Sequence, residues 1–223
     1  MAYGAPQRYD VTTEIVTPAT SAALTDLAAV KAELNLTGTD ANRDSALERY
    51  IKASSAAIAA YCNRGFATQT VRDTFRSPTP APIGLLESPI RPLQLSSWPV
   101  IALTSVTEDG VAINSGSDFA PNKQAGQLAR IDASGSERAW TAGVIIAEYS
   151  CGFDEIPAEV EDAAIRMVAQ RYFARGRDAM LRSEKVAGVW EASYWVETGA
   201  SANGAISPDI RALLGNYRVA VLA

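Results

Sequence analysis

The first sustained pattern of apolar positions along the chain has the period of a helix. Leu27, Val30 and Leu34 fall at i, i+3 and i+7, which places them on one helix face. Thr25 precedes them and is a residue type that is favoured at an N-cap. The pattern therefore predicts a helix over residues 25–36.

A second helix is predicted over residues 41–63 and a third over residues 157–175. The second carries one stripe among small Ala and Ser side chains, formed by Leu47, Ile51, Ser54, Ile58 and Tyr61. Gly65 follows this stripe as a candidate left-handed residue at the helix end. The third helix has Pro157 at its first position, with acidic residues in its first turn and arginines near its end, as the helix dipole favours. We expect the three helices to pack as a bundle.

Between the second and third helices the pattern changes to alternation with turn residues. The segment "TQTVRDTFR" alternates, "GVIIAEYSCGF" is an apolar strand, and Asp109-Gly110 is the two-residue signal of a tight hairpin. Residues 67–150 are therefore predicted to form an antiparallel β-region inserted into the helical bundle. The expected fold class is α+β.

The two ends of the chain are predicted to be arms. Residues 1–23 are rich in Ala, Thr, Pro and Gly without a sustained period, so we expect an arm that is loose unless a partner orders it. Residues 24–180 form the expected core. Residues 181–223 are expected to form a strand arm, a flexible linker and a short helix, with Ser207 as its cap and Pro208 at its first position.

The stretch "RSEKVAGVWEASYWV" alternates like a strand and carries Trp190, Tyr194 and Trp195. One interpretation is an edge strand of the β-region with one face on the core. The other is a projecting hairpin or arm that buries both faces only in an assembly, because Trp and Tyr are favoured at interfaces. We expect Trp190 and Tyr194 to contact one protein surface and Trp195 another, at least one of them belonging to a neighbouring subunit.

The predicted C-terminal helix is amphipathic. Its apolar positions recur at i, i+3, i+4 and i+7 and are Ile210, Leu213, Leu214 and Tyr217. This face either packs on its own domain or docks on a partner. We favour docking, because the preceding spacer of Gly, Ala, Ser and Asn gives the helix reach.

Charge and composition narrow the possible functions. The 223 residues include 20 basic and 25 acidic side chains, a net charge of -5, which argues against a broad nucleic-acid-binding face. The two cysteines, Cys62 and Cys151, form no disulfide framework and are expected to be reduced. The N-terminus does not have the pattern of a signal peptide, and no apolar run approaches the roughly 18 residues of a membrane span, so no membrane partner is expected.

The sequence lacks histidine and the common motifs of catalytic and metal-binding sites. It contains no histidine, which removes Ser-His-Asp and Cys-His pairs and the commonest metal ligand. Two cysteines alone cannot complete a four-ligand zinc site, and the sequence has no phosphate-binding glycine motif. We therefore expect no catalytic, cofactor-binding or metal-binding residues and no enzyme activity. The alternative from another class is a small carboxylate-dependent enzyme.

The order of these parts resembles the head–tail connector (adaptor) proteins of tailed bacteriophages and gene transfer agents. The resemblance covers residues 24–66 and 145–218, including "Y-x-x-GF-x-x-IPAEVEDAAIRMVAQRYFARGR" and "SPDIRALLGNYR". It implies a structural protein of the virion neck, made in the host cytoplasm, that forms a homo-oligomeric ring, commonly of twelve subunits, beneath the portal protein.

The resemblance also implies what such a ring contacts. The ring extends the DNA channel and provides a platform for a stopper or tail terminator protein, while genomic DNA passes through the lumen without sequence-specific binding. The acidic balance of the chain agrees with such a lumen, because basic side chains would hold the phosphates. Interface positions for the portal or a neighbouring subunit are then Trp190, Tyr194, Trp195, Ile210, Leu213, Leu214 and Tyr217. Another neck or tail-completion protein is the alternative within the virion.

Overall fold

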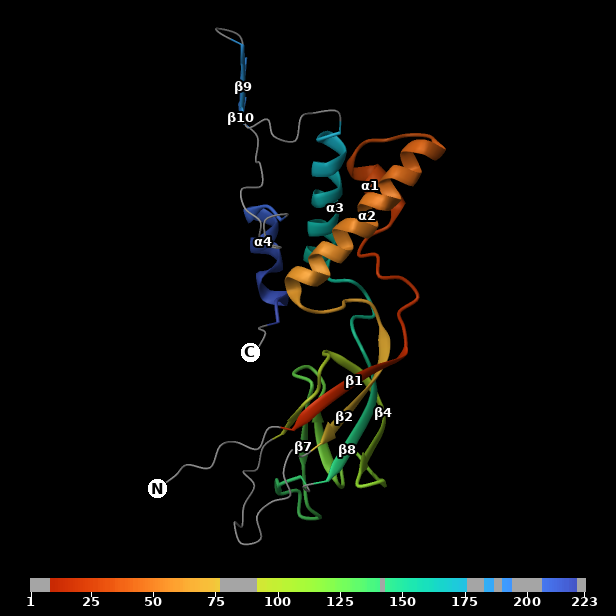
Figure 1. The fold of residues 1–223 in the computed structure, drawn as a ribbon, viewed down its shortest axis with the longest axis vertical. Helices are drawn as coiled ribbons and strands as arrows, with labels where there is room; N and C mark the ends of the chain where they lie inside the picture. Colours follow the sequence, from red (N-terminus) through yellow and green to blue (C-terminus); the bar gives the residue numbers. More distant parts are fainter. Residues whose placement is uncertain are drawn as a thin grey trace, which may run out of the picture. The chain divides into compact units, whose positions relative to one another are not determined.

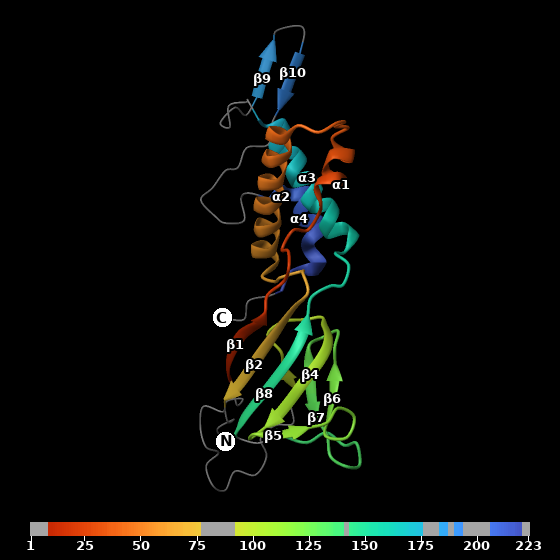
Figure 2. The ribbon, with the colours of Figure 1, turned by 90° about the vertical axis from the view of Figure 1, so that its right-hand side faces the viewer.

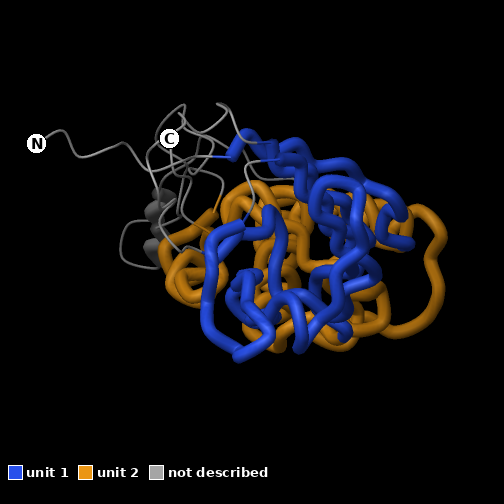
Figure 3. Tube along the Cα trace, turned by 90° about the horizontal axis from the view of Figure 1, so that it is seen from below, with its two compact units in different colours: residues 1–20, 68–154 blue, residues 21–67, 155–223 orange. Residues whose placement is uncertain are grey.

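The computed structural model describes residues 9–76, 92–140, 143–175, 183–186, 190–193 and 206–219. The chain divides into two compact units, coloured separately in Figure 3. The β unit comprises Met1–Thr20 and Thr68–Asp154, and the helical unit comprises Ser21–Ala67 and Glu155–Ala223. Both an antiparallel sheet and a helical bundle are present, so the predicted α+β class is confirmed (Figure 1).

The β unit is built on a five-stranded antiparallel sheet, in which β1, β2, β8 and β4 lie side by side (Figure 2). Its order is β1 (Asp10–Thr17), β2 (Gln69–Arg76), β8 (Val144–Cys151), β4 (Val100–Glu108) and β5 (Val111–Ile113). Asp109 and Gly110 join β4 to β5 with φ of 52° and 81°. Positive φ at both positions is what the tightest hairpin turn requires, so this predicted turn is confirmed.

A second, three-stranded sheet shares its core with the first. Its order is β3 (Leu93–Gln94), β7 (Gln127–Arg130) and β6 (Phe119–Asn122). Buried positions alternate along the two central strands β2 and β8, and in β8 Ile145, Ala147 and Tyr149 are fully buried. Together with Leu93 and Leu128 of the second sheet they belong to one hydrophobic cluster.

The expectation of a loose N-terminal arm is wrong for β1. This strand pairs with β2 over seven register positions, from Asp10 opposite Arg76 to Thr17 opposite Thr70. Every residue of the strand is exposed, so burial of an apolar face does not hold it in place. Backbone pairing with β2, which cannot be inferred from the sequence pattern of β1, therefore holds this segment as a strand.

Among its described residues, the helical unit contains the three predicted main helices and the predicted short C-terminal helix. They are α1 (Leu27–Glu33), α2 (Ala41–Cys62), α3 (Ala158–Phe173) and α4 (Pro208–Leu214), followed by the short 3-10 helix η1 (Gly215–Tyr217). α1, α2 and α3 pack on one another around Val30, Leu47, Ile51 and Val168, so the predicted bundle is confirmed. None of the helices among the described residues is long and apolar enough to cross a membrane.

Three predicted helix ends differ from those observed. Asp26, not Thr25, caps α1, because its carboxylate accepts a 2.7 Å hydrogen bond from the Ala29 amide. Asn63, with φ of 52°, takes the left-handed position at the end of α2 that Gly65 was expected to fill. Pro157 is the N-cap of α3 and stands one residue before the helix.

The aromatic stretch forms a hairpin. Strands β9 (Ser183–Val186) and β10 (Trp190–Ser193) pair with each other in an antiparallel two-stranded sheet of their own. The interpretation as an edge strand of the β-region is therefore wrong, and the alternative of a hairpin agrees with the backbone. Tyr194 and Trp195 lie outside the described residues.

Candidate functional site

The C-terminal helix α4 belongs to the helical unit. Ile206, Ile210 and Leu214 are fully buried, and α4 packs on α3. Across this contact the side-chain amide of Gln170 donates a 3.2 Å hydrogen bond to the hydroxyl of Ser207. Ser207 and Pro208 occupy the N-cap and first position as predicted. For Ile210 and Leu214, packing within the subunit is therefore what the structure shows, in place of the docking that the sequence favours.

The residues after α4 are tied to the end of α2. The Val219 amide donates a 2.9 Å hydrogen bond to the carbonyl of Cys62, and the Asn63 side-chain amide donates a 3.1 Å bond to the carbonyl of Val219. The guanidinium of Arg218 lies 5.3 Å from the ring centroid of Tyr61. These bonds leave the terminal segment little freedom to act as a separate docking arm.

Leu213 and Tyr217 keep part of their surface accessible, although α4 is anchored. The Tyr217 hydroxyl donates to the carboxylate of Glu159, and this hydrogen bond raises the pKa of Tyr217. Its ring lies 6.2 Å from that of Phe66, measured between centroids. Of the four predicted positions on this helix face, these two can reach a partner without unpacking α4.

The structure places the three aromatic candidates only in part. Trp190 stands opposite Val186 in the backbone register of the β9–β10 hairpin. Tyr194 and Trp195 lie outside the described residues, so the interface role of all three remains a prediction.

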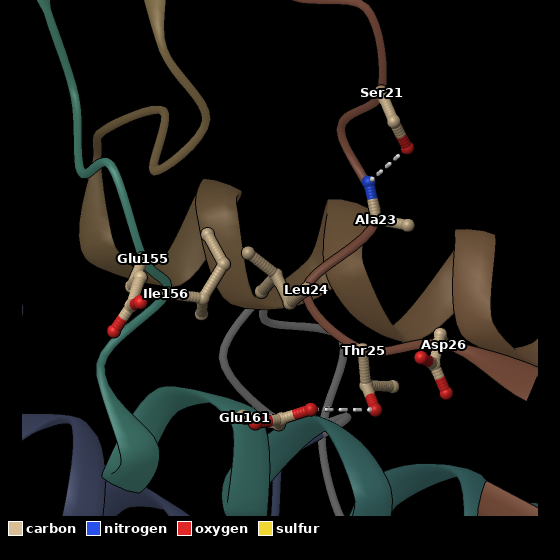
Figure 4. Close-up of a pocket in the computed structure, with 8 residues that line it drawn as sticks. All are labelled: Ser21, Ala23, Leu24, Thr25, Asp26, Glu155, Ile156 and Glu161. Atoms are coloured by element: carbon tan, nitrogen blue, oxygen red, sulfur yellow. Dashed lines mark hydrogen bonds between the residues drawn. The ribbon is translucent and has the colours of Figure 1, made fainter. Parts of the chain in front are cut away.

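A recess of about 520 Å³ opens beside the segment that leads into α1 (Figure 4). It contains three carboxylates and is lined by Ser21, Ala23, Leu24, Thr25, Asp26, Glu155, Ile156 and Glu161. Asp26 caps α1, and the Thr25 hydroxyl donates a 3.2 Å hydrogen bond to Glu161. Two of the three carboxylates thus stabilise local structure.

A groove of about 560 Å³ runs between α2 and the same segment. Its α2 wall consists of Glu48, Ile51, Lys52, Ser55, Ala56 and Ala59, at helical spacing. The amide of Leu24 donates a 3.0 Å hydrogen bond to the Ser55 hydroxyl and fixes the segment against the helix. The small side chains of this helix were noted in the sequence, but the groove itself depends on the path of residues 21–27.

No group of three or more Cys, Asp or Glu residues among those described could hold a metal ion. Cys62 and Cys151 are free and buried. Burial raises the pKa of the Cys62 thiol to about 11, opposed by the charges of Arg64 and Arg218. A thiol in this state is a packing residue, not a nucleophile.

The fold defines an α+β chain in which strands are inserted between the second and third helices of a bundle. The chain belongs to the head completion protein family, whose family model matches residues 23–220. The resemblance to head–tail connector proteins is thereby confirmed at the level of the family. No curated protein matches the chain.

Solved structures with a similar chain include two necks of gene transfer agent particles. One similar chain comes from the neck of a native gene transfer agent particle computed with C12 symmetry; it is 18% identical, with a TM-score of 0.53 over 95% of this chain and 97% of that chain. Another comes from the neck of an empty particle computed with C6 symmetry, at 19% identity, a TM-score of 0.48 and the same coverage. At this identity the first similarity shows a shared fold.

Proposed function

We propose that this protein is a structural subunit of the virion neck, a head–tail connector that forms a ring beneath the portal. The ring extends the DNA channel and provides the attachment platform for a stopper or tail protein. The observation that carries the proposal is the family match over residues 23–220, which includes residues 68–154 of the β unit, most of the helical unit and the C-terminal helix.

The shared fold supports a ring as the form of assembly. The similar chain lies in a neck computed with C12 symmetry, and it matches this chain over nearly its whole length. A cyclic ring requires two different surfaces on each subunit, which contact each other head to tail. Twelve copies of a chain with net charge -5 form an acidic ring, through which DNA passes without tight phosphate contacts.

The residues that we propose as contacts to the portal or to a neighbouring subunit belong to two segments of the chain. Trp190, Tyr194 and Trp195 remain candidates on the β9–β10 hairpin and the residues after it. Leu213 and Tyr217 are candidates on the accessible side of α4 and η1. We leave Ile210 and Leu214 out of this proposal, because both side chains are buried within the helical unit of the single chain.

The mass of the assembly tests this proposal. Native mass spectrometry of the purified chain, alone and with its portal protein, is expected to find a ring of about a dozen copies. A stopper or tail-completion protein would instead appear outside that ring, so electron microscopy of particles carrying a tagged chain separates the two. Density for the tag away from the portal-proximal neck contradicts the connector role.

A further inference from the structure

The core-facing side of the five-stranded sheet continues onto β1 but is uncovered there. Val11 stands opposite Phe75 and Ile15 opposite Val71, and directly opposite residues of neighbouring strands share one face. Phe75 and Val71 are 1% exposed, whereas Val11 is 46% and Ile15 is 56% exposed. The inner face of the sheet therefore ends in apolar side chains that no other part of the described chain covers.

The opposite edge of the same sheet shows the same feature. In β5, Val111 stands opposite Glu108 and Ile113 opposite Val106, and both partners are buried. Val111 is 66% exposed although it lies on the core-facing side. Each edge of the sheet thus presents apolar side chains on the same face.

The strand directions make these two edges compatible. All neighbouring pairs in the order β1-β2-β8-β4-β5 are antiparallel, so β1 and β5 run in the same direction. A second copy shifted in the plane of the sheet brings its β1 alongside β5 of the first, in parallel, with the core-facing sides together. Val11 and Ile15 of one copy then lie on the same side as Val111 of the next.

We propose that β1 of one subunit pairs with β5 of the next subunit in the ring, so that the sheet continues across the subunit boundary. This inference rests on the proposed function, because a ring supplies the head-to-tail neighbour. An open edge with exposed apolar side chains invites a further strand. If β1 paired with β1 of another copy, the two copies would be related by a two-fold axis and would form a closed dimer, which cannot extend into a ring.

Engineered disulfides test this contact. Thr12, Glu14 and Ala112 lie on the opposite, polar face of the sheet, so their replacement leaves the apolar face intact. The double variants Thr12→Cys/Ala112→Cys and Glu14→Cys/Ala112→Cys cover two parallel registers. Under mild oxidation, assembled rings of one of them are expected to yield covalent oligomers up to the full ring on a non-reducing gel. The native Cys62 and Cys151 are buried and do not compete.

Single variants are the matched controls. Rings of Thr12→Cys, Glu14→Cys or Ala112→Cys alone are expected to give no cross-link, while mixed rings of a β1 variant and Ala112→Cys give covalent dimers. Dimers from a single β1 variant overturn the proposal in favour of β1–β1 pairing. Rings that assemble but never cross-link overturn it and leave the connector function standing. Absence of rings in both the purified chain and particles contradicts both proposals.

A charge on the apolar side provides a second measurement. Ile15→Lys is expected to raise the protein concentration needed for ring assembly at least about tenfold, because a buried unpaired charge opposes association. Thr12→Lys places the same charge on the same strand but on the polar face, and it is expected to have a much smaller effect. Equal effects of the two variants would show that the apolar face does not form the contact.

Discussion

The hydroxyl of Tyr149 donates a 2.7 Å hydrogen bond to the carboxylate of Asp73, and both side chains are fully buried in the β unit. Asp73 accepts three more hydrogen bonds: from the Thr13 hydroxyl at 2.7 Å, and from the hydroxyl and amide of Ser96 at 2.7 and 2.8 Å. Asp73 lies on β2, so its carboxylate links this strand to β1, to β8 and to the residues that precede β4. Four donors are what make a buried carboxylate tolerable.

Tyr149→Phe is expected to destabilise the β unit by about 1–3 kcal/mol, because it removes one donor from a buried carboxylate. Burial, and after it the charge of Asp73, raises the pKa of Tyr149, so the hydroxyl remains a donor at all working pH values. Denaturant unfolding followed by circular dichroism measures the change. Combination with Asp73→Asn is expected to give a smaller loss than the sum of the single variants. A loss below about 0.5 kcal/mol for Tyr149→Phe would show that the hydrogen bond is not needed.

Thr13→Val is expected to loosen β1 at the sheet edge, since the Thr13 hydroxyl bonds Asp73 across the strand pair. The amides of β1 should exchange with solvent faster by about fivefold to tenfold, which corresponds to roughly 1 kcal/mol for one hydrogen bond. Hydrogen exchange detected by mass spectrometry reports this. Thr12→Val removes a hydroxyl from the neighbouring position on the other face and is expected to change exchange little. Equal rates in the two variants contradict the role of Thr13.

The helical bundle could be predicted from the sequence because its signal is local. Leu27 and Val30 of α1 share one helix face, as do Leu47 and Ile51 of α2, and the packing of α1, α2 and α3 follows from those faces. The cap of α1 was misplaced by one residue because Thr25 and Asp26 are both good caps. Thr25 is instead 8% exposed and donates to Glu161, a contact 136 positions away that no local pattern contains.

The surfaces of the chain were harder to predict than its core. An amphipathic helix shows that Ile210 and Leu214 will be buried, but its periodicity does not tell whether their partner is this chain or another. The same limit applies to β1, where Val11 and Ile15 alternate with polar residues yet remain exposed. The Asp73 network also escapes prediction, since it joins residues 60 and 76 positions apart.

The buried ion pair of Glu108 and Arg130 should matter more than a surface pair. Arg130 Nε lies 3.0 Å from Glu108 Oε2, with side chains only 6% and 8% exposed. Glu108→Gln is expected to cost up to about 3–5 kcal/mol of unfolding free energy, because it leaves the buried guanidinium with only the carboxylate of Asp118, 3.7 Å from Arg130 Nη1, as a counter-charge. Glu148→Gln is the matched control: it breaks a 2.9 Å pair with Arg72, which is 42% exposed, and should cost below about 1 kcal/mol. Similar losses in the two variants contradict this ranking.

Stability is expected to fall as the pH rises from 9 to 11 because of Cys62. The pKa of Cys62 is about 11 in the folded chain against an ordinary value of 9.0. The thiol therefore ionises first in the unfolded chain, and between these pH values this ionisation favours the unfolded state over the folded state. The slope attributable to this thiol is at most about 1.4 kcal/mol per pH unit. Below pH 9 the thiol is neutral in both states and contributes no slope. Unfolding curves of wild type and Cys62→Ala measure the difference, and parallel pH profiles would contradict it.

Because α4 is anchored in the helical unit, we expect substitutions at its buried apolar positions to affect stability more than a substitution at its accessible apolar position. Ile210→Ala and Leu214→Ala are expected to cost about 2–5 kcal/mol each, because both side chains are fully buried in the helical unit. Leu213→Ala, at a half-buried position of the same helix, should cost below about 1.5 kcal/mol and act mainly on assembly with the portal. Denaturant unfolding of the free chain and co-sedimentation with the portal separate the two effects. Deletion of residues 206–223 is accordingly expected to unfold or weaken the helical unit, and a stable truncated chain would show that α4 is an independent arm after all.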